Sequence, residues 1–291
     1  MSQVLAPTPT LDLLRDAAAA SGGAGNRLFE ALADGYPDTL EQRPAHVLRD
    51  ADASPMDLER LLTAAGFADF EELRERAAAE ADRRLSSPDL RLTARLGDRA
   101  DSRELLGRIL DREHDNLQRT LEKLQANGAL ELAAARITAA RRRFVAGGLK
   151  SAAYASLLAA DLTASMPYVT HVPDTVAAAV DLATDVRNGD VLVAFCLRRY
   201  SRRTVALARE FHAAGGTVVA VTDDADGPLA AHCDVPVVVS TSSLSYADSP
   251  TAVATVVHVL ATLATAGAKG ARKRLDRRSQ VARALEIYEE E

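Results

Sequence analysis

The chain has 291 residues, of which 47% are hydrophobic and 26% are charged, and its formal net charge at pH 7 is −6. This length and balance exclude an intrinsically disordered chain and allow two domains, each with its own core. The two cysteines form neither a disulfide framework nor a metal-ligand spacing, and no signal peptide or membrane-spanning run is visible. We therefore expect a cytoplasmic protein with no membrane partner.

Charge is distributed unevenly along the sequence. Residues 1–85 contain nine arginines, no lysine and sixteen acidic residues, which gives this stretch a net charge of −7. Residues 266–291 instead contain a run of basic side chains: Lys269, Arg272, Lys273, Arg274, Arg277 and Arg278. A surface that binds nucleic acid needs positive charge, and only this C-terminal run supplies a concentrated source of it.

Short helices separated by turns are predicted for residues 11–85. Gly22 and the glycines just after it interrupt the first helical segment, and Gly35-Tyr36-Pro37 breaks the next. A further helix is predicted from Phe70 to about Arg84.

A pair of helices joined by a tight turn is predicted between these segments. Residues 44–51 form the first helix, and Asp52 and Ala53 form the turn. Ser54-Pro55 then combines an N-cap residue with proline at the first helical position, which is a strong start signal. The second helix ends at Gly66, a C-terminal glycine of the expected kind.

From residue 102 onward, the spacing of apolar residues indicates other kinds of structure. Leucines and Ile109 recur at helical spacing over residues 102–127 and predict one long amphipathic connector that ends at Asn127-Gly128. Strands and helices then alternate, with strands predicted at residues 144–146, 168–172, 191–195, 217–221 and 235–239, and helices at 151–165, 175–184, from about 201, around 229 and 249–265. Such alternation predicts an α/β doubly wound domain with a five-stranded parallel sheet.

The first loop with potential binding chemistry is Gly147 to Ser151, between a strand and a helix. Ligands of open parallel sheets bind at the carboxyl ends of the strands, where the crossover direction switches. Gly148 would let the backbone approach an anion, and Ser151 lies at the N-terminus of the following helix. The alternative is a tight turn with a serine cap.

A second loop follows the strand at residues 191–195. It contains Arg198, Arg199, Ser201, Arg202 and Thr204 at or just before a helix N-terminus. Arginines are unfavourable there unless an anion or carboxylates compensate them, and arginine suits bidentate phosphate or carboxylate capture. A solvated basic surface or contact with acidic residues of a partner subunit is the alternative.

The third loop, residues 240–249, is rich in hydroxyl groups. Ser245 is a candidate contact for a polar ligand, whereas Asp248 and Ser249 are better explained as helix caps. The aspartates at 223, 224 and 226 follow a strand but lack a calcium-loop pattern, so we interpret them as solvated turn carboxylates. We expect no catalytic residue, no metal and no cofactor.

Together these residues resemble the RpiR family of bacterial transcription regulators, in which a helix-turn-helix precedes a sugar isomerase (SIS) domain that binds phosphosugars or related metabolites. The resemblance covers roughly residues 11–265. Its firmest points are Ser54-Pro55, Arg60, Gly66-Phe67, residues 70–74, Gly148, Ser151, residues 198–202, Thr204, Ser245 and Asp248-Ser249.

The resemblance implies four parts. Residues 1–85 would be an all-α helix-turn-helix domain that binds double-stranded DNA, and residues 86–129 a connector helix. Residues 130–266 would be a SIS-type domain that senses a small anionic metabolite such as a sugar phosphate, followed by a basic-to-acidic tail at 267–291.

It also implies roles for individual residues. The helix from Ser54 would be the recognition helix and would present its N-terminal residues to DNA: Ser54, Met56, Asp57 and Arg60. Ser151, Ser201 and Thr204 would hold the anionic group of the ligand.

Several residues depart from the family pattern. Asp52 occupies the turn position where a glycine is usual, and Asp57 and Glu59 occupy recognition-helix positions where hydroxyl or neutral residues are usual. Thr63 replaces a common arginine, so Arg60 is the cation that this helix offers to a phosphate. Cys196 replaces a serine that contacts phosphate in many SIS domains.

Three functions therefore remain open: a DNA-binding regulator, a degenerate sensor that acts through protein partners, and a phosphosugar isomerase. An isomerase needs a general base, and after Ser201 the nearest candidates are Glu210 and His212. We also expect a homodimer or homotetramer, because the connector and the helix at 249–265 are predicted to bury little in a single chain.

Overall fold

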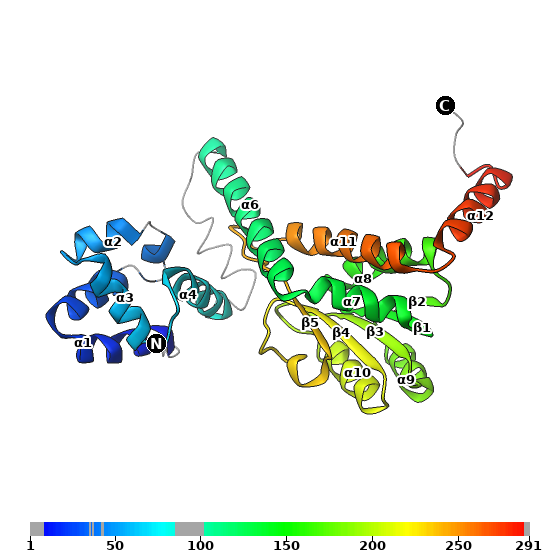
Figure 1. The fold of residues 1–291 in the computed structure, drawn as a ribbon, viewed down its shortest axis with the longest axis horizontal. Helices are drawn as coiled ribbons and strands as arrows, with labels where there is room; N and C mark the ends of the chain where they lie inside the picture. The colour runs from blue at the N-terminus through cyan, green and yellow to red at the C-terminus, as the bar shows by residue number, and fades with distance from the viewer. Residues whose placement is uncertain (1–8, 35, 37, 42–43, 85–101, 288–291) are drawn as a thin grey trace, which may run out of the picture. The chain divides into compact units, whose positions relative to one another are not determined.

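The computed structural model describes residues 9–34, 36, 38–41, 44–84 and 102–287 (Figure 1). The chain divides into two compact units, residues 1–97 and residues 98–291. The predicted break at Gly35-Tyr36-Pro37 falls largely outside the described residues.

The first unit is helical. Its elements are α1 (Pro9–Ala33), the 3-10 helix η1 (Asp38–Glu41), α2 (Pro44–Asp50), α3 (Pro55–Ala64) and α4 (Phe70–Arg84). The predicted interruption near position 22 is confirmed, because α1 bends at Gly22, whose φ of 79° is readily adopted only by glycine. Leucines from four elements fill the core, and all of them are buried: Leu14, Leu28, Leu32, Leu40, Leu61 and Leu73.

The turn between α2 and α3 is held by α1. Asp52 adopts the left-handed conformation with a φ of 45°, which is strained for a residue other than glycine. Arg27 of α1 donates from Nε to the carbonyl of Ala51 (2.9 Å) and from Nη2 to the carbonyl of Asp52 (3.0 Å). These bonds fix the orientation of α2 and α3 against α1.

The second unit is an α/β domain. Its elements are α6 (Ser102–Asn127), α7 (Ala129–Ala139), β1 (Arg142–Gly147), α8 (Ser151–Ser165), β2 (Val169–Val172), α9 (Val176–Asp185), β3 (Asp190–Phe195), α10 (Arg202–Ala213), β4 (Thr217–Thr222), η2 (Ala230–His232), β5 (Val235–Val238), α11 (Thr251–Gly267) and α12 (Ala271–Ala284). The strands are all parallel and lie in the order β2-β1-β3-β4-β5. The predicted fold class, a helical N-terminal region followed by a five-stranded parallel sheet, is confirmed.

Helices cover both faces of this sheet (Figure 1). One face packs against α7, α8 and α11 around a core that includes Val193 and Phe195, and the other packs against α9 and α10 around a core that includes Leu192 and Phe211. Every residue of β3 is buried, as expected for the central strand of a doubly wound sheet.

The environment of α11 differs from the sequence-based expectation. The helix at 249–265 was expected to bury little in a single chain, but Val253, Val256, Val257 and Leu260 of α11 are completely buried against the rest of the second unit. That expectation is wrong because α11 packs on α7 and α8, and α7 was not predicted.

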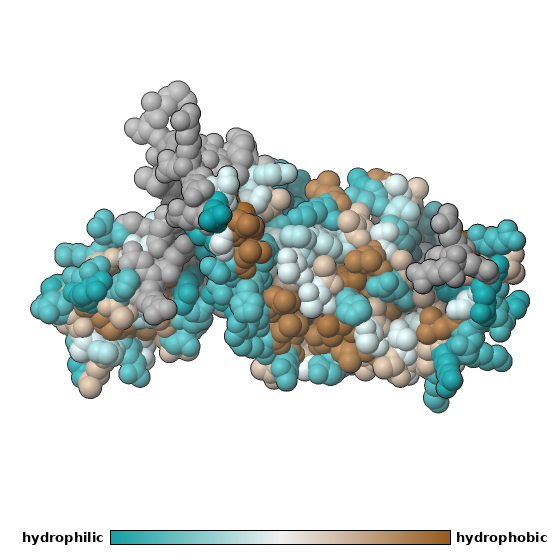
Figure 2. All heavy atoms as spheres, turned by 90° about the horizontal axis from the view of Figure 1, so that it is seen from above, coloured by the Kyte–Doolittle hydropathy of each residue, from teal (hydrophilic) through white to brown (hydrophobic). Residues whose placement is uncertain are grey.

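Apolar side chains nevertheless remain exposed on the layer of α7, α8 and α11. Leu132, Leu157 and Leu263 have 46%, 46% and 37% of their surface exposed. Figure 2 looks onto this layer and shows apolar side chains gathered over it. At the N-terminal half of α6, Leu106 and Leu110 are also exposed.

Among the described residues, no single helix is long and apolar enough to cross a membrane. The helices α11 and α12 pass that test only as a pair, and they meet at an angle of 109°.

Candidate functional site

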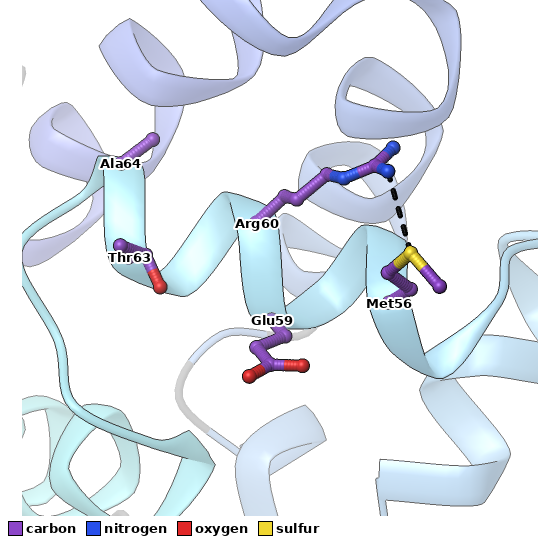
Figure 3. A pocket seen from close by; sticks show the side chains of 5 residues that line it. All are labelled: Met56, Glu59, Arg60, Thr63 and Ala64. Atoms are coloured by element: carbon purple, nitrogen blue, oxygen red, sulfur yellow. Dashed lines mark hydrogen bonds between the residues drawn. The ribbon is translucent and has the colours of Figure 1, made fainter.

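The outer surface of α3 is the first candidate. Met56, Glu59, Arg60, Thr63 and Ala64 line a shallow hollow along this helix (Figure 3). Arg60 points along the helix toward Met56, where its Nη2 lies 3.3 Å from the Met56 sulfur, and Glu59 points to the other side. Arg60 is therefore the one cation among the residues that line this hollow.

A capping box begins α3 and engages two of the predicted DNA contacts. The backbone N–H of Asp57 donates to Oγ of Ser54 (3.3 Å), and the backbone N–H and hydroxyl of Ser54 donate to the carboxylate of Asp57 (3.0 and 2.6 Å). The hydrogen bond from the Ser54 hydroxyl is the main reason that the pKa of Asp57 is lowered. Ser54 and Asp57 thus bind each other, while Met56 and Arg60 remain exposed.

The second candidate lies at the carboxyl edge of the sheet. The chain leaves β1 for β2 on one side, and β3 lies on the other, so the edge between β1 and β3 is the switch point. Gly148 follows β1, and a Cβ atom built on it would lie 2.6 Å from Oγ of Ser201 and 3.1 Å from Oδ2 of Asp174. The fold therefore brings the first two predicted loops into direct contact, and glycine is required at 148.

Two helices begin beside this contact. Ser151 is buried at the first position of α8, and its backbone N–H donates to the carbonyl of Gly148 (3.1 Å). Ser201 is the N-cap of α10, and its Oγ accepts from the backbone N–H of buried Thr204 (3.2 Å). The positive dipole ends of two helices thus lie near one place, which suits an anion.

The arginines of the second loop do not form one cluster. Arg198 is largely buried, and it lies 3.9 Å from Asp223 and 3.5 Å from Asp248. Arg199 and Arg202 are exposed. From the sequence, either an anion or carboxylates were expected to balance these arginines. For Arg198 the structure shows carboxylates, those of Asp223 and Asp248.

Asp223 contributes a carboxylate that was not assigned to the ligand site from the sequence. Its side chain is only 10% exposed, so the interpretation of Asp223 as a solvated turn residue is wrong. Burial raises the pKa of its carboxyl group, although Arg198 and a hydrogen bond from Tyr200 oppose the increase. The signal available in the sequence was its position directly after β4, at the same edge of the sheet as the other loops.

The third loop also reaches this edge. Lys150 donates from Nζ to the carbonyl of Asp248, and the Asp248 carboxylate faces Arg198. Asp248 therefore pairs with a neighbouring loop rather than capping α11, whereas Ser249 accepts from the backbone N–H of Thr251 (3.3 Å). Ser245 accepts from the backbone N–H of Ala247 (3.4 Å) and lies within the same loop.

Helix α6 binds the third loop through polar side chains, of which Asn116 and Thr120 are buried. Oγ of Ser240 donates to Asn116 (2.8 Å), and Asn116 donates to the carbonyl of Ser242. The backbone N–H of Ser240 donates to Thr120 (2.9 Å), and Ser249 donates to Glu113. Glu113, Asn116 and Thr120 lie at helical spacing on one face, which was the available but overlooked sign that α6 is more than a connector.

Cys196 lies behind this site rather than in it. Its thiol is buried among the residues between the sheet and α10, with Sγ 4.0 Å from the carbonyl oxygen of Ser201. Burial raises the pKa of the thiol to about 11, so Cys196 is protonated at neutral pH.

Comparison with known proteins identifies the second unit. Residues 136–265 match the family model of the SIS domain. The C-terminal unit is a SIS domain. The sugar isomerase domain of an RpiR transcription factor from Sphaerobacter thermophilus is 26% identical, with a TM-score of 0.57, over 61% of this chain and 99% of that one. No curated protein sequence matches the chain.

A second similar structure extends over both units. The NanR protein of Vibrio vulnificus, solved in complex with ManNAc-6P, is 17% identical with a TM-score of 0.56, and the match covers 95% of this chain and 98% of that one. At this identity the likeness concerns the fold. A helical region followed by a SIS domain is the architecture expected of RpiR-type proteins, and the resemblance inferred from the sequence is confirmed.

Proposed function

We propose that this chain is a cytoplasmic DNA-binding transcription regulator whose SIS domain senses a small anionic metabolite such as a sugar phosphate. The observation that carries the sensor role is the contact between Gly148 and Ser201 at the switch point. It joins the N-termini of α8 and α10 beside loops that contain Arg198 and Asp248. The sugar phosphate in the NanR structure supports this ligand class.

The proposed anion subsite comprises Gly148, Ser151, Ser201 and Thr204. The exposed side chains of Arg199 and Arg202 would supply positive charge at its rim. Here the anion would accept hydrogen bonds from helix N-termini and hydroxyl groups. The compensated Arg198, with Asp223 and Asp248, would contact another part of the ligand, such as its hydroxyl groups. Ser245 would contact the ligand from the third loop.

The DNA-binding role is proposed for α2 and α3, which form a helix-turn-helix in this interpretation. Met56 and Arg60 would reach the major groove, while Ser54 and Asp57 would position the start of α3 through the capping box. The similar RpiR factor and NanR support a regulator.

A sensor that has lost DNA binding is the second candidate. The charge on the outer surface of α3 favours this candidate. Glu59 and Arg60 are the charged residues that line the hollow there, so the one positive charge is offset by one negative charge. Because phosphate contacts supply much of the affinity for DNA, this surface should bind weakly by itself.

An isomerase is less well supported. Glu210 is exposed and pairs with Arg209, and His212 lies 3.7 Å from Asp234, which precedes β5 at the amino edge of the sheet. These two candidate bases are therefore remote from the proposed ligand site. The carboxylates at the carboxyl edge include Asp174, Asp223 and Asp248. A turnover assay over a panel of sugar phosphates tests whether any of them serves as a base, and we expect no turnover.

The sensor role is tested by thermal unfolding of the full chain with a panel of hexose and amino-sugar phosphates. At ligand concentrations of about 100 times Kd, binding stabilises the folded chain by roughly 2.7 kcal/mol, which raises the unfolding temperature by several degrees. Gly148→Ala should abolish this increase, because the new Cβ would displace Ser201. Gly107→Ala in α6, where nothing lies within 4 Å, is the matched control. No stabilisation by any sugar phosphate would contradict the proposal.

A further inference from the structure

The C-terminal helix α12 has an unusual concentration of positive charge. Residues 269–284 contain seven basic residues and one carboxylate, Asp276, which gives this segment a net charge of +6. All its basic side chains are exposed: Lys269, Arg272, Lys273, Arg274, Arg277, Arg278 and Arg283. The SIS family model ends at residue 265, before this segment begins.

Core packing does not explain α12. Ala271 is its one buried residue, and Ala282 is partly covered. The helix contacts α8 near its own N-terminus, where Arg274 donates from Nε and Nη2 to the carbonyl of Thr163 (3.1 and 3.0 Å). It meets α11 at 109° and extends beyond the sheet and its covering helices (Figure 1).

The charge on α12 is not balanced within the part of the chain that the structure describes. Besides Arg274, Arg277 contacts a side chain, the amide oxygen of Gln280 (3.4 Å), and no described carboxylate pairs with a cation of this helix. Like charges three and four residues apart repel each other across a helix surface. Lys273 and Arg277, and likewise Arg274 and Arg278, have this spacing, so a polyanion that binds here would relieve the repulsion.

The apolar residues of α12 argue against a membrane surface as the polyanion. An interfacial helix needs a continuous apolar face. Arg278 lies three residues after Leu275 and four before Ala282, so at helical spacing it interrupts the stripe that these residues would form. At helical spacing the cations of α12 are spread around most of the helix, and the side that carries Ala271, Leu275 and Ala282 is free of them apart from Arg278 at its border. Charge that covers most of a rod suits binding along a charged polymer.

We propose that α12 binds the phosphate backbone of duplex DNA and supplies sequence-independent affinity that α3 lacks. The inference rests on the proposed DNA-binding function, and charge complementarity carries it. The first 85 residues have a net charge of −7, and the hollow on α3 has one cation, Arg60. Helix α12 is about 21 Å long at 1.5 Å per residue, long enough to place several cations near successive phosphates.

The test compares three full-length proteins by fluorescence anisotropy with a labelled duplex of random sequence across a salt series. The first is the natural chain. The second carries four substitutions to glutamine, at Arg272, Lys273, Arg277 and Arg278, and retains the Arg274 contact. The control has four exposed cations of the same unit replaced by glutamine, at Arg108, Lys123, Arg136 and Arg187. Circular dichroism checks that all three proteins fold. Because the substituted residues are exposed, the substitutions should leave folding unchanged.

We expect the α12 variant to lose about 10-fold or more in affinity at low salt. The slope of log K against log salt should become shallower by about 1 for each phosphate contact that is lost, because fewer counterions are released. The control should retain most of the slope of the natural chain. Equal losses in both variants, or no salt-dependent binding by the natural chain, would overturn the inference.

Two further arms separate this inference from related ideas. In the first, vesicles that contain phosphatidylglycerol replace the DNA. If the α12 variant binds vesicles less tightly than the natural chain but binds DNA equally well, the inference is overturned. The second arm uses DNA from upstream of the protein's own gene. If α12-dependent binding to random DNA is found without any preference for upstream DNA, the inference stands and the proposed regulator function fails.

Discussion

Asp223 shows how one residue can combine a cost in stability with a place in the proposed ligand site. Its carboxylate lies 3.9 Å from Arg198 and accepts a hydrogen bond from Tyr200, yet burial raises its pKa. A carboxylate whose pKa is raised because burial penalises its charged form is more readily explained by ligand recognition than by folding.

We predict that Asp223→Asn stabilises the free protein at pH 7. A folded-state pKa above the unfolded value of about 3.9 means that the stability contribution of Asp223 is fully present below that value and is lost as the pH rises through the folded pKa. The variant should therefore unfold at a higher temperature than the natural chain at pH 7, and the difference should shrink toward pH 4. Thermal unfolding measured at several pH values checks this.

The exposed Asp226 supplies the control, because Asp226→Asn should change the unfolding temperature little at any of these pH values. The same Asp223→Asn variant should respond less to sugar phosphates. A lower unfolding temperature at pH 7 would mean that the ion pair with Arg198 outweighs the cost of burial.

At the scale of elements, the periodicity of the sequence predicts all five strands and most helices. Runs such as Val191 to Phe195, between turn signals, are typical of central strands of a covered sheet. Helix α7 was missed because it is short and rich in alanine, so it has little amphipathic contrast. Helix α12 was missed because charged residues cover most of its surface, and apolar periodicity is the signal on which helix prediction depends.

The candidate site was predictable only where local chemistry marks it. Glycine and serine at strand-to-helix loops identify Gly148, Ser151 and Ser201. The partners of Arg198 come from the loop directly after β4 and from the loop before α11, and no local pattern relates segments 25 and 50 residues away from it in the chain. These distant segments meet because the sheet is parallel, which places the carboxyl ends of neighbouring strands at one edge.

Helix α6 holds the loop that contributes Asp248 to the proposed ligand site. Asn116 is buried and bonds to Ser240 and Ser242 of the loop that contains Asp248. We predict that Asn116→Ala lowers the free energy of unfolding by about 1 to 3 kcal/mol, because buried polar partners lose their hydrogen bonds. It should also weaken the effect of a bound sugar phosphate on DNA affinity.

The measurement is DNA anisotropy with and without the sugar phosphate that stabilises the chain most. Gln118→Ala, on the exposed side of the same helix, is the control and should retain the full response. A normal response in the Asn116 variant would exclude this contact as the coupling route.

At the scale of the whole molecule, the exposed leucines of α6, α7, α8 and α11 predict self-association. Symmetric pairing would cover this layer. It would also let the α3 helices of two chains bind one operator. Analytical ultracentrifugation at micromolar concentration should show a dimer or tetramer, and replacing Leu132 and Leu157 with serine should shift it toward monomer. Arg136 and Arg187 replaced by glutamine provide the control. A natural chain that sediments as a monomer would contradict this prediction.

The central claim, that this SIS-domain chain is a DNA-binding regulator, is tested most directly by fluorescence anisotropy. Labelled DNA from upstream of its own gene is compared with a scrambled duplex across a salt series, for the natural chain and Arg60→Gln. We predict tighter binding to the upstream DNA, a steep salt slope, and a loss of about 1 to 3 kcal/mol of that preference in Arg60→Gln. Equal binding to both duplexes, unaffected by Arg60→Gln, would contradict the account and favour a sensor that acts through protein partners.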